Sequence, residues 1–498
     1  MNERYACIHG HFYQPPRENP WTDVIEAEPS AAPWTNWNER ITDECYAPNT
    51  AAEILGPDGA VERRFDNYAA ISFNVGPTLM SWMARARPAV HRAIVDSDIR
   101  GRARFGGHGG AIAQAHGHLI MPLANERDRR TQVKWGIADF RYRFGRAPEG
   151  MWLPETAVDV PTLEAVAAEG IAFTILAPHQ AARVRRQGGA WRAAGAGVAP
   201  GRAYRQRLPS GRDIALFFYD GVLARGVAFD GLLHDGAAFA RGLEAAAERG
   251  DAPRLAHLAT DGESYGHHHR HGEMALAWAL DFLERESRVR LTTYAEFLAA
   301  HPPAWEVEVA EGTSWSCAHG VRRWSGGCDC GTGGDGWDYG WRAPLRRALD
   351  ALRDRLAGVF EAEGSRHLRD PWAARDAYIE WLLPPGADTR RAWEADHLAA
   401  GADRRTAMAL LEMQREAMRM FTSCGWFFDD PAGLETRQVL RYAARAVDLA
   451  GRVADGAPGR AFVDALGAIR SNREDGWTAA EEYRRILRED RVPEVERR

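Results

Sequence analysis

Two acidic residues stand directly after predicted strands, in settings that suit the cleavage of a glycosidic bond. Glu155 follows the apolar run 150–153 and a proline that fixes the local backbone, and Asp261 follows the run 255–259 and precedes a glycine that permits a tight turn. In this chemistry one carboxylate attacks the anomeric carbon while the other protonates the leaving oxygen. The plainer interpretations are a solvated glutamate in a turn and a cap for the helix predicted over 274–283.

Their separation and protonation decide what the two carboxylates could do. A gap of about 5–5.5 Å favours retention of the anomeric configuration, whereas inversion needs a wider gap that admits water. The acid must keep its proton near neutral pH, which requires burial or a neighbouring negative charge.

Histidines lie near the same predicted strand ends. Imidazoles can hydrogen-bond sugar hydroxyls or bind a metal ion. The histidines are His9 and His11 after the first strand, His108, His116 and His118 near the third, and His267, His268, His269 and His271 after the seventh. Consecutive histidines cannot all face one ion, so the last group favours a solvated or substrate-facing loop. An ion between His9, His11 and Asp261 would instead indicate a metal-dependent hydrolase such as a polysaccharide deacetylase.

A second candidate ligand set lies in a stretch rich in glycine and tryptophan. Cys317, His319, Cys328 and Cys330 offer four soft or borderline ligands that could close a tetrahedron around a structural zinc ion. The alternative is a set of free cysteines in a glycine-rich active-site lid. Six cysteines in 498 residues are too few for a disulfide scaffold and indicate a reducing, cytoplasmic compartment.

Short apolar runs alternate with helical patterns over the first 300 residues. This alternation predicts an α/β fold with parallel strands, and seven strands over this length suit a closed barrel better than an open sheet. The predicted strands are 5–8, 70–73, 104–107, 150–153, 172–176, 214–219 and 255–259. The helices between them are predicted over 76–95, 131–144, 160–169 and 237–248. The polar residues that follow the strands would share the face where barrel enzymes place catalysis.

The pattern changes in the last third of the chain. Residues 303–343 read as an irregular connecting lid, and no strand signal returns after it. The expected domains are therefore a catalytic barrel over 1–302, the lid over 303–343 and a helical domain over 344–498. Within the barrel, 183–212 read as a long loop or hairpin. The helices of the last domain are predicted over 345–363, 373–383, 405–421, 436–449 and 461–470.

Composition excludes several classes of function. Hydrophobic residues make up 45% and charged residues 27%, the balance of a globular protein rather than a disordered or fibrous one. The net charge of −6 provides no basic excess for nucleic acid. No apolar run approaches the ~20 residues of a membrane helix, and no apolar signal stretch follows the N-terminus. We therefore expect neither nucleic acid nor membrane as a partner. The sequence contains no pattern that indicates the oligomeric state.

Three motifs together resemble glycoside hydrolase family 57, which contains α-glucan-active amylases, 4-α-glucanotransferases and branching enzymes. The segments that carry the resemblance are His9-Gly10-His11-Phe12-Tyr13-Gln14-Pro15, Met151-Trp152-Leu153-Pro154-Glu155 and Asp261-Gly262-Glu263-Ser264-Tyr265-Gly266-His267. The first has two residues more than the family's His-x-His-Gln-Pro. The resemblance implies that Glu155 is the nucleophile and Asp261 the general acid/base. It implies an incomplete (β/α)7 barrel followed by helices.

The resemblance also implies a substrate and a subgroup. The expected activity is that of a retaining enzyme on an α-glucan or maltooligosaccharide, by hydrolysis or transfer, with no cofactor needed for catalysis. The expected sugar-binding residues are His9, His11, Gln14, His108, His118, Trp152, Glu263, Tyr265, His267, Trp426 and Asp429. Segments 314–320 and 422–430 resemble markers of a subgroup with a C-terminal domain of unknown function. His268 and His269 stand where branching enzymes often have tryptophans after the acid motif. Thr156 stands where a cysteine is common. The rival readings are the deacetylase and a non-catalytic glucan-binding protein.

Overall fold

The chain folds into two compact units. The computed structural model describes residues 4–195, 198–250, 253–331, 336–384, 386–454, 459–473 and 476–490. The first unit, here the barrel unit, comprises Met1–Gln14, Ala27–Gln114 and Phe140–Trp315. The second, here the helical unit, comprises Pro15–Glu26, Ala115–Asp139 and Ser316–Arg498. Within the described ranges, no helix combines the length and apolar character needed to cross a bilayer.

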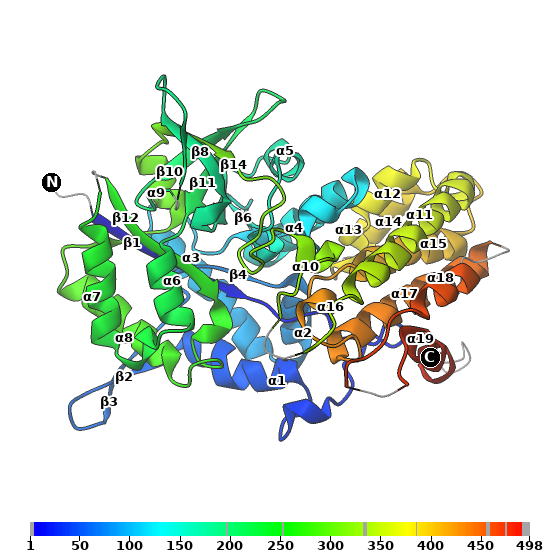
Figure 1. Cartoon of the computed structure of the whole chain (residues 1–498), viewed down its shortest axis with the longest axis horizontal. Coiled ribbons are helices and arrows are strands. Elements are labelled where there is room, and N and C mark those ends of the chain that lie inside the picture. The colour runs from blue at the N-terminus through cyan, green and yellow to red at the C-terminus, as the bar shows by residue number, and fades with distance from the viewer. Residues whose placement is uncertain are drawn as a thin grey trace. The chain divides into compact units, whose positions relative to one another are not determined.

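Parallel strands form the core of the barrel unit (Figure 1). The strands of this set are β1 (Arg4–Phe12), β4 (Ser72–Val75), β5 (Ala113–Gln114), β6 (Met151–Trp152), β7 (Phe173–Leu176), β11 (Asp213–Phe218) and β12 (Arg254–Asp261). β1 pairs with β12 and β4, β5 pairs with β6, and β7 pairs with β11. Single bridges, Phe73 to Ala111 and Gly150 to Phe173, connect these pairs. The resulting order, β11-β7-β6-β5-β4-β1-β12, confirms the predicted (β/α)7 arrangement.

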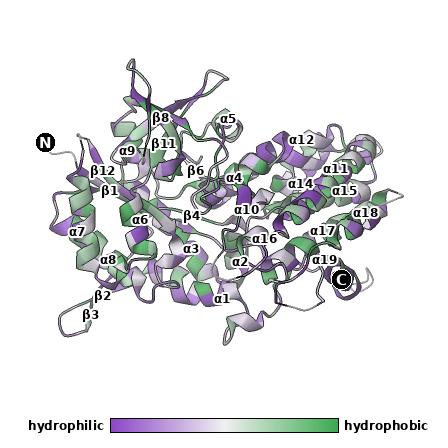
Figure 2. Ribbon diagram, viewed as in Figure 1, coloured by the Kyte–Doolittle hydropathy of each residue, from purple (hydrophilic) through white to green (hydrophobic). Residues whose placement is uncertain are grey.

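Several helices of the barrel unit have an apolar face, and Figure 2 shows hydrophobic and hydrophilic residues alternating along their ribbons. In α7, for example, Phe239 and Leu243 are buried, whereas Arg241 is exposed. Apolar side chains at this spacing lie on one face of a helix and drive its packing. The helices are α1 (Trp37–Ile41), α2 (Pro77–Ala86), α3 (Pro88–Arg104), α5 (Val160–Ala168), α6 (Gly221–Ala228), α7 (Gly236–Ala247), α8 (Gly272–Arg285) and α9 (Tyr294–Ala300).

The segment 183–212, predicted as a long loop or hairpin, contributes to an antiparallel extension of the sheet in which β8 and β9 form a hairpin. β11 continues into a sheet of order β7-β11-β10-β14-β8-β9. The added strands are β8 (Ala181–Arg186), β9 (Arg192–Ala193), β10 (Ala203–Arg207) and β14 (Trp305–Val309). Residues 196 and 197 of the predicted loop lie outside the described residues. β14 also corrects the predicted lid, because 303–315 belong to the barrel unit and the division falls after Trp315. The smaller pairings are β2 (Ala52–Leu55) with β3 (Val61–Phe65), and β13 (Arg290–Leu291) with β1.

Two local predictions were wrong. The third strand is β5, not 104–107, which instead end α3 and form a turn in which Gly106 and Gly107 have φ of 62° and 96°. Glycine adopts these values without a steric penalty, so the segment turns rather than extends. The helix predicted over 76–95 is divided between α2 and α3 at Pro88, because proline lacks the amide that a continuous helix would need.

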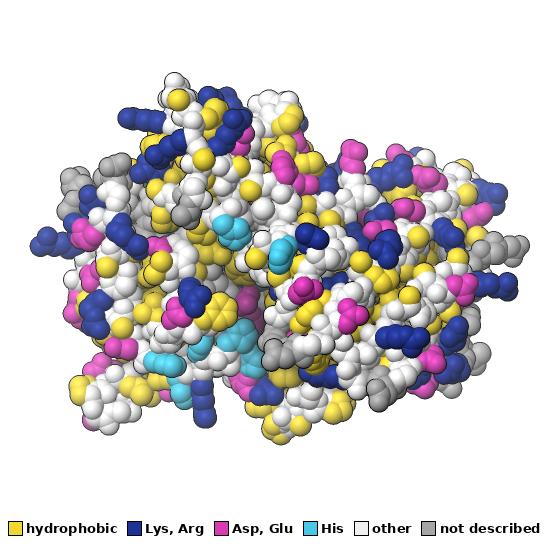
Figure 3. All heavy atoms as spheres, in the orientation of Figure 1, with side chains coloured by type: hydrophobic (Ala, Val, Ile, Leu, Met, Phe, Trp, Pro, Cys, Tyr) yellow, Lys and Arg dark blue, Asp and Glu magenta, His cyan; other side chains and the backbone are white. Residues whose placement is uncertain are grey.

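Three long helices form the centre of the helical unit. α11 (Arg342–His367), α15 (Arg404–Arg419) and α17 (Leu434–Val453) pack together. The remaining helices are α10 (Arg322–Ser325), α12 (Pro371–Ala377), α13 (Ile379–Leu382), α14 (Ala387–His397), α16 (Cys424–Phe427), α18 (Gly459–Leu466) and α19 (Ala479–Glu489). Acidic and basic side chains are interspersed over the face drawn in Figure 3, which agrees with the near-balanced charge of the chain.

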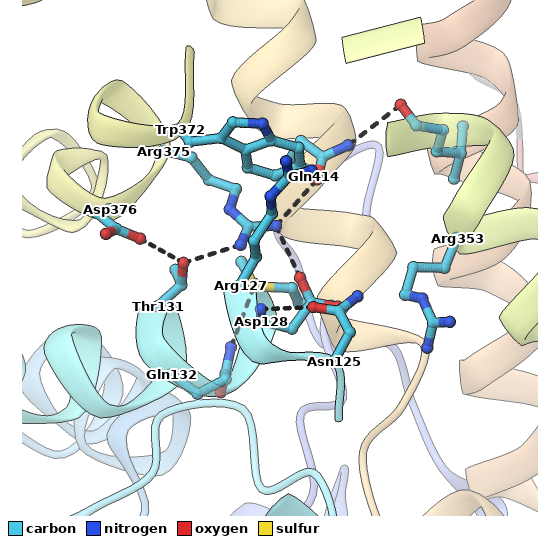
Figure 4. A network of polar contacts seen from close by, with 12 residues as sticks. Asn125, Arg127, Asp128, Thr131, Gln132, Arg353, Trp372, Arg375, Asp376 and Gln414 are labelled. Atoms are coloured by element: carbon cyan, nitrogen blue, oxygen red, sulfur yellow. Dashed lines mark hydrogen bonds and ion pairs between the residues drawn. The ribbon is translucent and has the colours of Figure 1, made fainter. Parts of the chain in front are cut away.

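The helical unit is larger than the predicted domain because it includes two segments from early in the chain. Residues 126–139 of α4 (Glu126–Phe144) belong to it, and 140–144 belong to the barrel unit. Figure 4 shows how Arg375 of α12 joins α4 to α15: its guanidinium donates to Asp128 at 2.7 Å, to Thr131 at 3.0 Å and to Gln414 at 3.1 Å. A buried charge needs such partners, so these bonds fix the early segment in the unit.

Candidate active site

The carboxyl ends of the parallel strands bring polar side chains together in the barrel unit. In β1, His11 is paired in register with Asn74 of β4 on one side and Asp261 of β12 on the other. Gln114 of β5 is likewise paired with Trp152 of β6. Parallel strands place their carboxyl ends on one face, so residues distant in sequence meet there.

Glu155 lies in a strained turn directly after β6. Its φ is 57° and that of Thr156 is 49°, values that side chains with a Cβ rarely adopt. The buried amide of Gln180 holds the turn: Thr156 Oγ1 donates to Gln180 Oε1 at 2.8 Å, and Gln180 Nε2 donates to the Thr156 carbonyl at 2.8 Å. The turn therefore has one backbone conformation and one direction for the Glu155 side chain.

Trp315 fixes the carboxylate of Glu155. Its indole Nε1 donates to Glu155 Oε2 at 3.1 Å, and its backbone amide donates to the Glu155 carbonyl at 3.0 Å. A hydrogen bond to a carboxylate stabilises the ionised form. Trp315 also packs edge-on against Trp152, with ring centroids 5.1 Å apart.

Asp261 ends β12 with its side chain accessible to solvent but surrounded on most sides by protein atoms. This partial exclusion of water, and after it the negative charge of Glu155, raises the pKa of Asp261 to about 7. The two carboxyl groups are thus close enough to interact electrostatically. One is held by a hydrogen-bond donor and the other retains its proton up to near-neutral pH, which is the division of roles that acid catalysis beside a nucleophile requires.

Glu263 is a third acidic residue of the same face, and it is buried. Burial and the charge of Asp261 raise the pKa of Glu263 to about 8. Its Oε1 accepts hydrogen bonds from Tyr46 Oη at 2.5 Å and from the Tyr13 backbone amide at 2.9 Å. These bonds attach the loop after β1 to the turn after β12, so Glu263 has a positioning role here.

His9 and His11 stack on the indole of Trp152, with ring centroids 5.0 and 4.8 Å from it. Asn74 joins the two imidazoles: its Oδ1 accepts from His9 Nε2 at 3.1 Å, and its Nδ2 lies 2.9 Å from His11 Nδ1, to which it donates. Burial lowers the pKa of each imidazole to about 3, so both rings are neutral at physiological pH.

Two buried donors beside these rings lack a protein acceptor. Trp152 Nε1 and Gln114 Nε2 have no hydrogen-bond partner among the described residues. A buried donor without a partner costs free energy. Tyr219 adds a hydroxyl near Asp261, whose charge, after burial, raises the pKa of the phenol. The face thus combines aromatic rings and hydrogen-bond donors, the two features that sugar binding uses.

Comparison with known families accounts for the catalytic segments. Residues 107–310 match the sequence model described as glycosyl hydrolase family 57, a range that contains Glu155 and Asp261. Residues 107–310 are thus similar to glycosyl hydrolase family 57. Residues 337–495 match a family described as a domain of unknown function, DUF3536, in agreement with the predicted subgroup. No curated protein matches the chain.

Solved structures related to family 57 share the fold. An exo-type maltose-forming amylase from Pyrococcus sp. ST04 aligns with a TM-score of 0.70 and 15% identity, covering 89% of this chain and 79% of that one. A 4-alpha-glucanotransferase from Thermococcus litoralis aligns at 0.55 and 14%, covering 90% of this chain and 60% of that one. A GH57-type branching enzyme from Pyrococcus horikoshii aligns at 0.54 and 15%, covering 93% and 89%.

One residue expected at the sugar site of the barrel unit lies elsewhere. His108 precedes β5 and is paired with Glu149, which precedes β6, with 2.7 Å between His108 Nδ1 and Glu149 Oε1. These are the amino ends of the two strands, opposite the ends that hold Glu155. His108 is therefore a structural residue, and the expectation of a substrate contact was wrong.

Three expected residues belong to the helical unit. His118 is buried, and its Nδ1 lies 2.7 Å from Ser423 Oγ. Trp426 is 1% exposed, donates from Nε1 to the Arg342 carbonyl at 3.2 Å and packs on Phe421. Asp429 accepts at its carbonyl from the Trp341 indole at 3.3 Å. Packing within the helical unit accounts for the burial of Trp426.

The remaining expected residues of the barrel unit lie around the loops after β1 and β12. Gln14 is buried and donates to the Tyr13 carbonyl at 3.0 Å. Tyr265 is fully buried and accepts from Thr260 Oγ1 at 3.3 Å, so its ring supports the loop from beneath. His267 is partly exposed and its Nδ1 is paired with Glu44. Of the three, His267 presents accessible surface.

Sequence reasoning did not assign Asn74, Gln114, Tyr219 and Trp315 to the site. Asn74 directly follows the predicted strand 70–73, and Trp315 lies within the marker segment 314–320, but neither position by itself indicates a role in the site. The register of β4 and β5 against their neighbours explains the first two. Trp315 lies 160 positions from Glu155, and no local pattern signals a contact over that separation.

The alternative metal centre is not favoured. Among the described residues, His9, His11 and Asp261 do not gather within coordination distance of one point, and the set that does lies in the helical unit. Asn74 instead occupies the position between the two imidazoles. The neutral rings therefore serve as stacked, hydrogen-bonded supports of the site.

Proposed function

We propose that the chain is a retaining enzyme that acts on α-glucans by double displacement, with Glu155 as nucleophile and Asp261 as general acid/base. The observation that carries the proposal is the electrostatic pairing of the two: the charge of Glu155 contributes to the pKa of about 7 at Asp261. Trp315 meanwhile holds the Glu155 carboxylate in place by its hydrogen bond. The named relatives support α-glucans as the substrate class.

In the first step, a carboxylate oxygen of Glu155 forms a bond to the anomeric carbon while the glycosidic bond breaks. Asp261 transfers its proton to the leaving oxygen. In the second step, the Asp261 carboxylate takes a proton from water or from a sugar hydroxyl. The oxygen of that acceptor bonds to the anomeric carbon, and Glu155 leaves as a carboxylate. Two inversions give net retention, and the residues return to their starting protonation states.

Donors around the site would bind and orient the sugar. Gln114 Nε2 and Trp152 Nε1, the buried donors without a partner among the described residues, would become available to sugar hydroxyls after a small movement of their neighbours. The Trp315 ring lies edge-on to Tyr219 at 6.5 Å and to His11 at 6.3 Å, which keeps its indole nitrogen directed at Glu155. Such a pre-organised donor contributes to catalysis because it needs no rearrangement in the transition state.

Replacement of Glu155 by Gln tests the proposal. We expect turnover of amylose and maltooligosaccharides to fall by at least about 10⁴-fold, because the nucleophile is lost while the side-chain size is kept. Glu149→Gln is the matched control, since Glu149 lies at the opposite end of β6 beside His108. A glycosyl ester on the peptide that contains Glu155, detected by mass spectrometry with a slowly turned-over fluorosugar substrate, would support the nucleophile directly. Undiminished turnover in Glu155→Gln would contradict the assignment.

Two further measurements separate the rival functions. A deacetylase would release acetate from an acetylated glucan and lose activity to chelators, whereas the proposed enzyme would do neither. A non-catalytic binding protein would bind glycogen without turnover. Product analysis then distinguishes hydrolysis, which increases the number of reducing ends, from transfer, which conserves that number.

A further inference from the structure

Three cysteines and a histidine converge in the helical unit, close to the start of α11. Cys317 Sγ lies 3.7 Å from Cys328 Sγ and 3.8 Å from Cys330 Sγ, and His319 Nδ1 lies 3.3 Å from Cys330 Sγ. The four ligand atoms all lie within 4.8 Å of one another. Among the described residues this is the one group of His, Cys, Asp or Glu side chains that converges in this way.

The two Sγ–Sγ separations and the Nδ1–Sγ separation lie close to the edges of a zinc tetrahedron. With Zn–S bonds of about 2.3 Å and Zn–N bonds of about 2.0–2.1 Å, tetrahedral angles place two sulfurs about 3.8 Å apart and a sulfur and a nitrogen about 3.6 Å apart. A disulfide needs a sulfur separation of about 2.05 Å and would leave the third thiol without a partner. The spacing therefore fits a shared ion better than a disulfide pair.

The backbone between the ligands is shaped to bring them together. The Gly320 amide donates to the Cys317 carbonyl at 3.0 Å, which closes a turn around His319. Gly326 and Gly327 have φ of 94° and 103° and reverse the chain before Cys328. A Cβ at Gly326 would lie 2.2 Å from Ala343 Cβ, so the turn also packs tightly on α11.

Two buried arginines supply charge balance for such a centre. Arg342 donates to the Cys330 carbonyl at 2.7 Å and Arg323 to the Ser316 carbonyl at 3.1 Å, so both guanidinium groups border the cluster. The hydrogen bonds that the structure gives them all go to backbone carbonyls. Three thiolates, one neutral imidazole and a divalent ion carry a net charge of −1, which buried cations would stabilise.

We infer that Cys317, His319, Cys328 and Cys330 bind one structural zinc ion. Four protein ligands close the coordination shell and leave no open position for catalysis. Apart from the four-residue α10, the described segment 316–331 has no helix or strand, and the ion would link the two ends of this segment. The inference stands apart from the proposed glucan chemistry, because it concerns other residues and its test does not use activity.

Metal analysis of the full chain, purified under reducing conditions, tests the inference. We expect about one zinc per chain in the wild type, and at least a tenfold lower content in Cys317→Ser and Cys330→Ser. Cys424→Ser is the matched control, since Cys424 lies in the helical unit outside the cluster and its replacement should leave the zinc content unchanged.

Two measurements keep the result clear if the cysteine variants fold poorly. His319 is exposed, so His319→Ala should fold and release zinc to a chelator at least tenfold faster than the wild type. Wild-type protein reconstituted with Co²⁺ should show the intense visible bands of tetrahedral thiolate coordination. A wild type that holds no zinc as isolated and takes up none on dialysis against zinc would overturn the inference. So would iron in its place, or zinc that persists in both serine variants.

Discussion

Trp315 donates a hydrogen bond from its indole nitrogen to Glu155 Oε2 across 3.1 Å, and this bond joins two residues 160 positions apart. A hydrogen bond to a charged group contributes about 1.5–3 kcal/mol, so Trp315→Phe should lower kcat by about 10- to 150-fold. The phenyl ring retains much of the packing against Trp152. Steady-state kinetics on maltooligosaccharides measure the change.

The matched control for this variant is Trp191→Phe. Trp191 directly precedes β9, and its ring packs against Arg183 and Arg185 of β8. It should leave kcat within about twofold. Wild-type kcat in Trp315→Phe would show that the indole nitrogen does not act on Glu155 during turnover.

The pKa of Asp261 predicts the alkaline limb of the pH–rate profile. Partial burial and the charge of Glu155 raise this pKa to about 7, and the residue must be protonated to protonate the leaving oxygen. Above the pKa, kcat/KM should therefore fall about tenfold per pH unit, with the limb centred near pH 7. The measurement is kcat/KM between pH 5 and 9, because this parameter reports the free enzyme.

Glu263 is the competing source of such a limb, because its pKa is about 8 and it interacts with Asp261. Interacting carboxyl groups titrate as a pair, so Glu263→Gln should shift the limb without abolishing it. Disappearance of the limb in Glu263→Gln would assign it to Glu263 and remove the argument for Asp261.

The raised pKa of Asp261 also predicts a cost in stability. An acid whose pKa is higher in the folded than in the unfolded protein destabilises the fold as pH rises from about 4 through 7, and the full cost remains above that range. Asp261→Asn should therefore raise Tm at pH 8 and leave it nearly unchanged at pH 4. Differential scanning calorimetry at both pH values measures the difference. Equal shifts at pH 4 and pH 8 would indicate a packing effect instead of relief of the charge.

Much of the catalytic unit could be predicted because its signals are local. Strand–helix alternation indicates the barrel. Glu155 and Asp261 could be singled out because each follows a predicted strand, Glu155 beside a proline and Asp261 beside a glycine. Local pattern failed where the chain departs from simple alternation. β5 has two residues, too few for a periodic signal. The segment 104–107 around Phe105 was predicted as the third strand in its place. The strands β8, β10 and β14 carry arginines and glutamates that form ion pairs across the sheet, such as Arg185 with Glu306, so they lacked an apolar pattern.

Other parts of the site depend on contacts that no local pattern encodes. The spacing of His108 resembles that of a strand-end ligand, yet its partner Glu149 lies at the amino end of the next strand. Membership of 15–26 and 115–139 in the helical unit depends on long-range bonds, such as that of Glu18 with Arg419 at 3.0 Å. Trp315 follows a strand that was itself missed, so its approach to Glu155 could not be inferred.

The strained turn that holds Glu155 depends on Gln180, and this dependence gives the last prediction. Thr156 is β-branched and has φ of 49°, a conformation that persists only where neighbours enforce it. Gln180 enforces it through its two hydrogen bonds to Thr156 and by accepting from the Ala177 amide at 2.8 Å. Gln180→Leu keeps the approximate size of the side chain but removes these hydrogen bonds, so the turn can relax and Glu155 loses its direction.

We expect Gln180→Leu to lower kcat by about 10- to 100-fold with little change in KM, because Gln180 positions the nucleophile. Gln180→Glu retains the accepting oxygen but loses the donor to the Thr156 carbonyl, and should fall between the wild type and the leucine variant. Steady-state kinetics and Tm are measured together on both variants. A loss of Tm without a loss of kcat would identify Gln180 as a residue that stabilises the barrel unit without positioning Glu155. A graded loss of kcat, in the order wild type, glutamate, leucine, is the outcome that the hydrogen-bond geometry predicts.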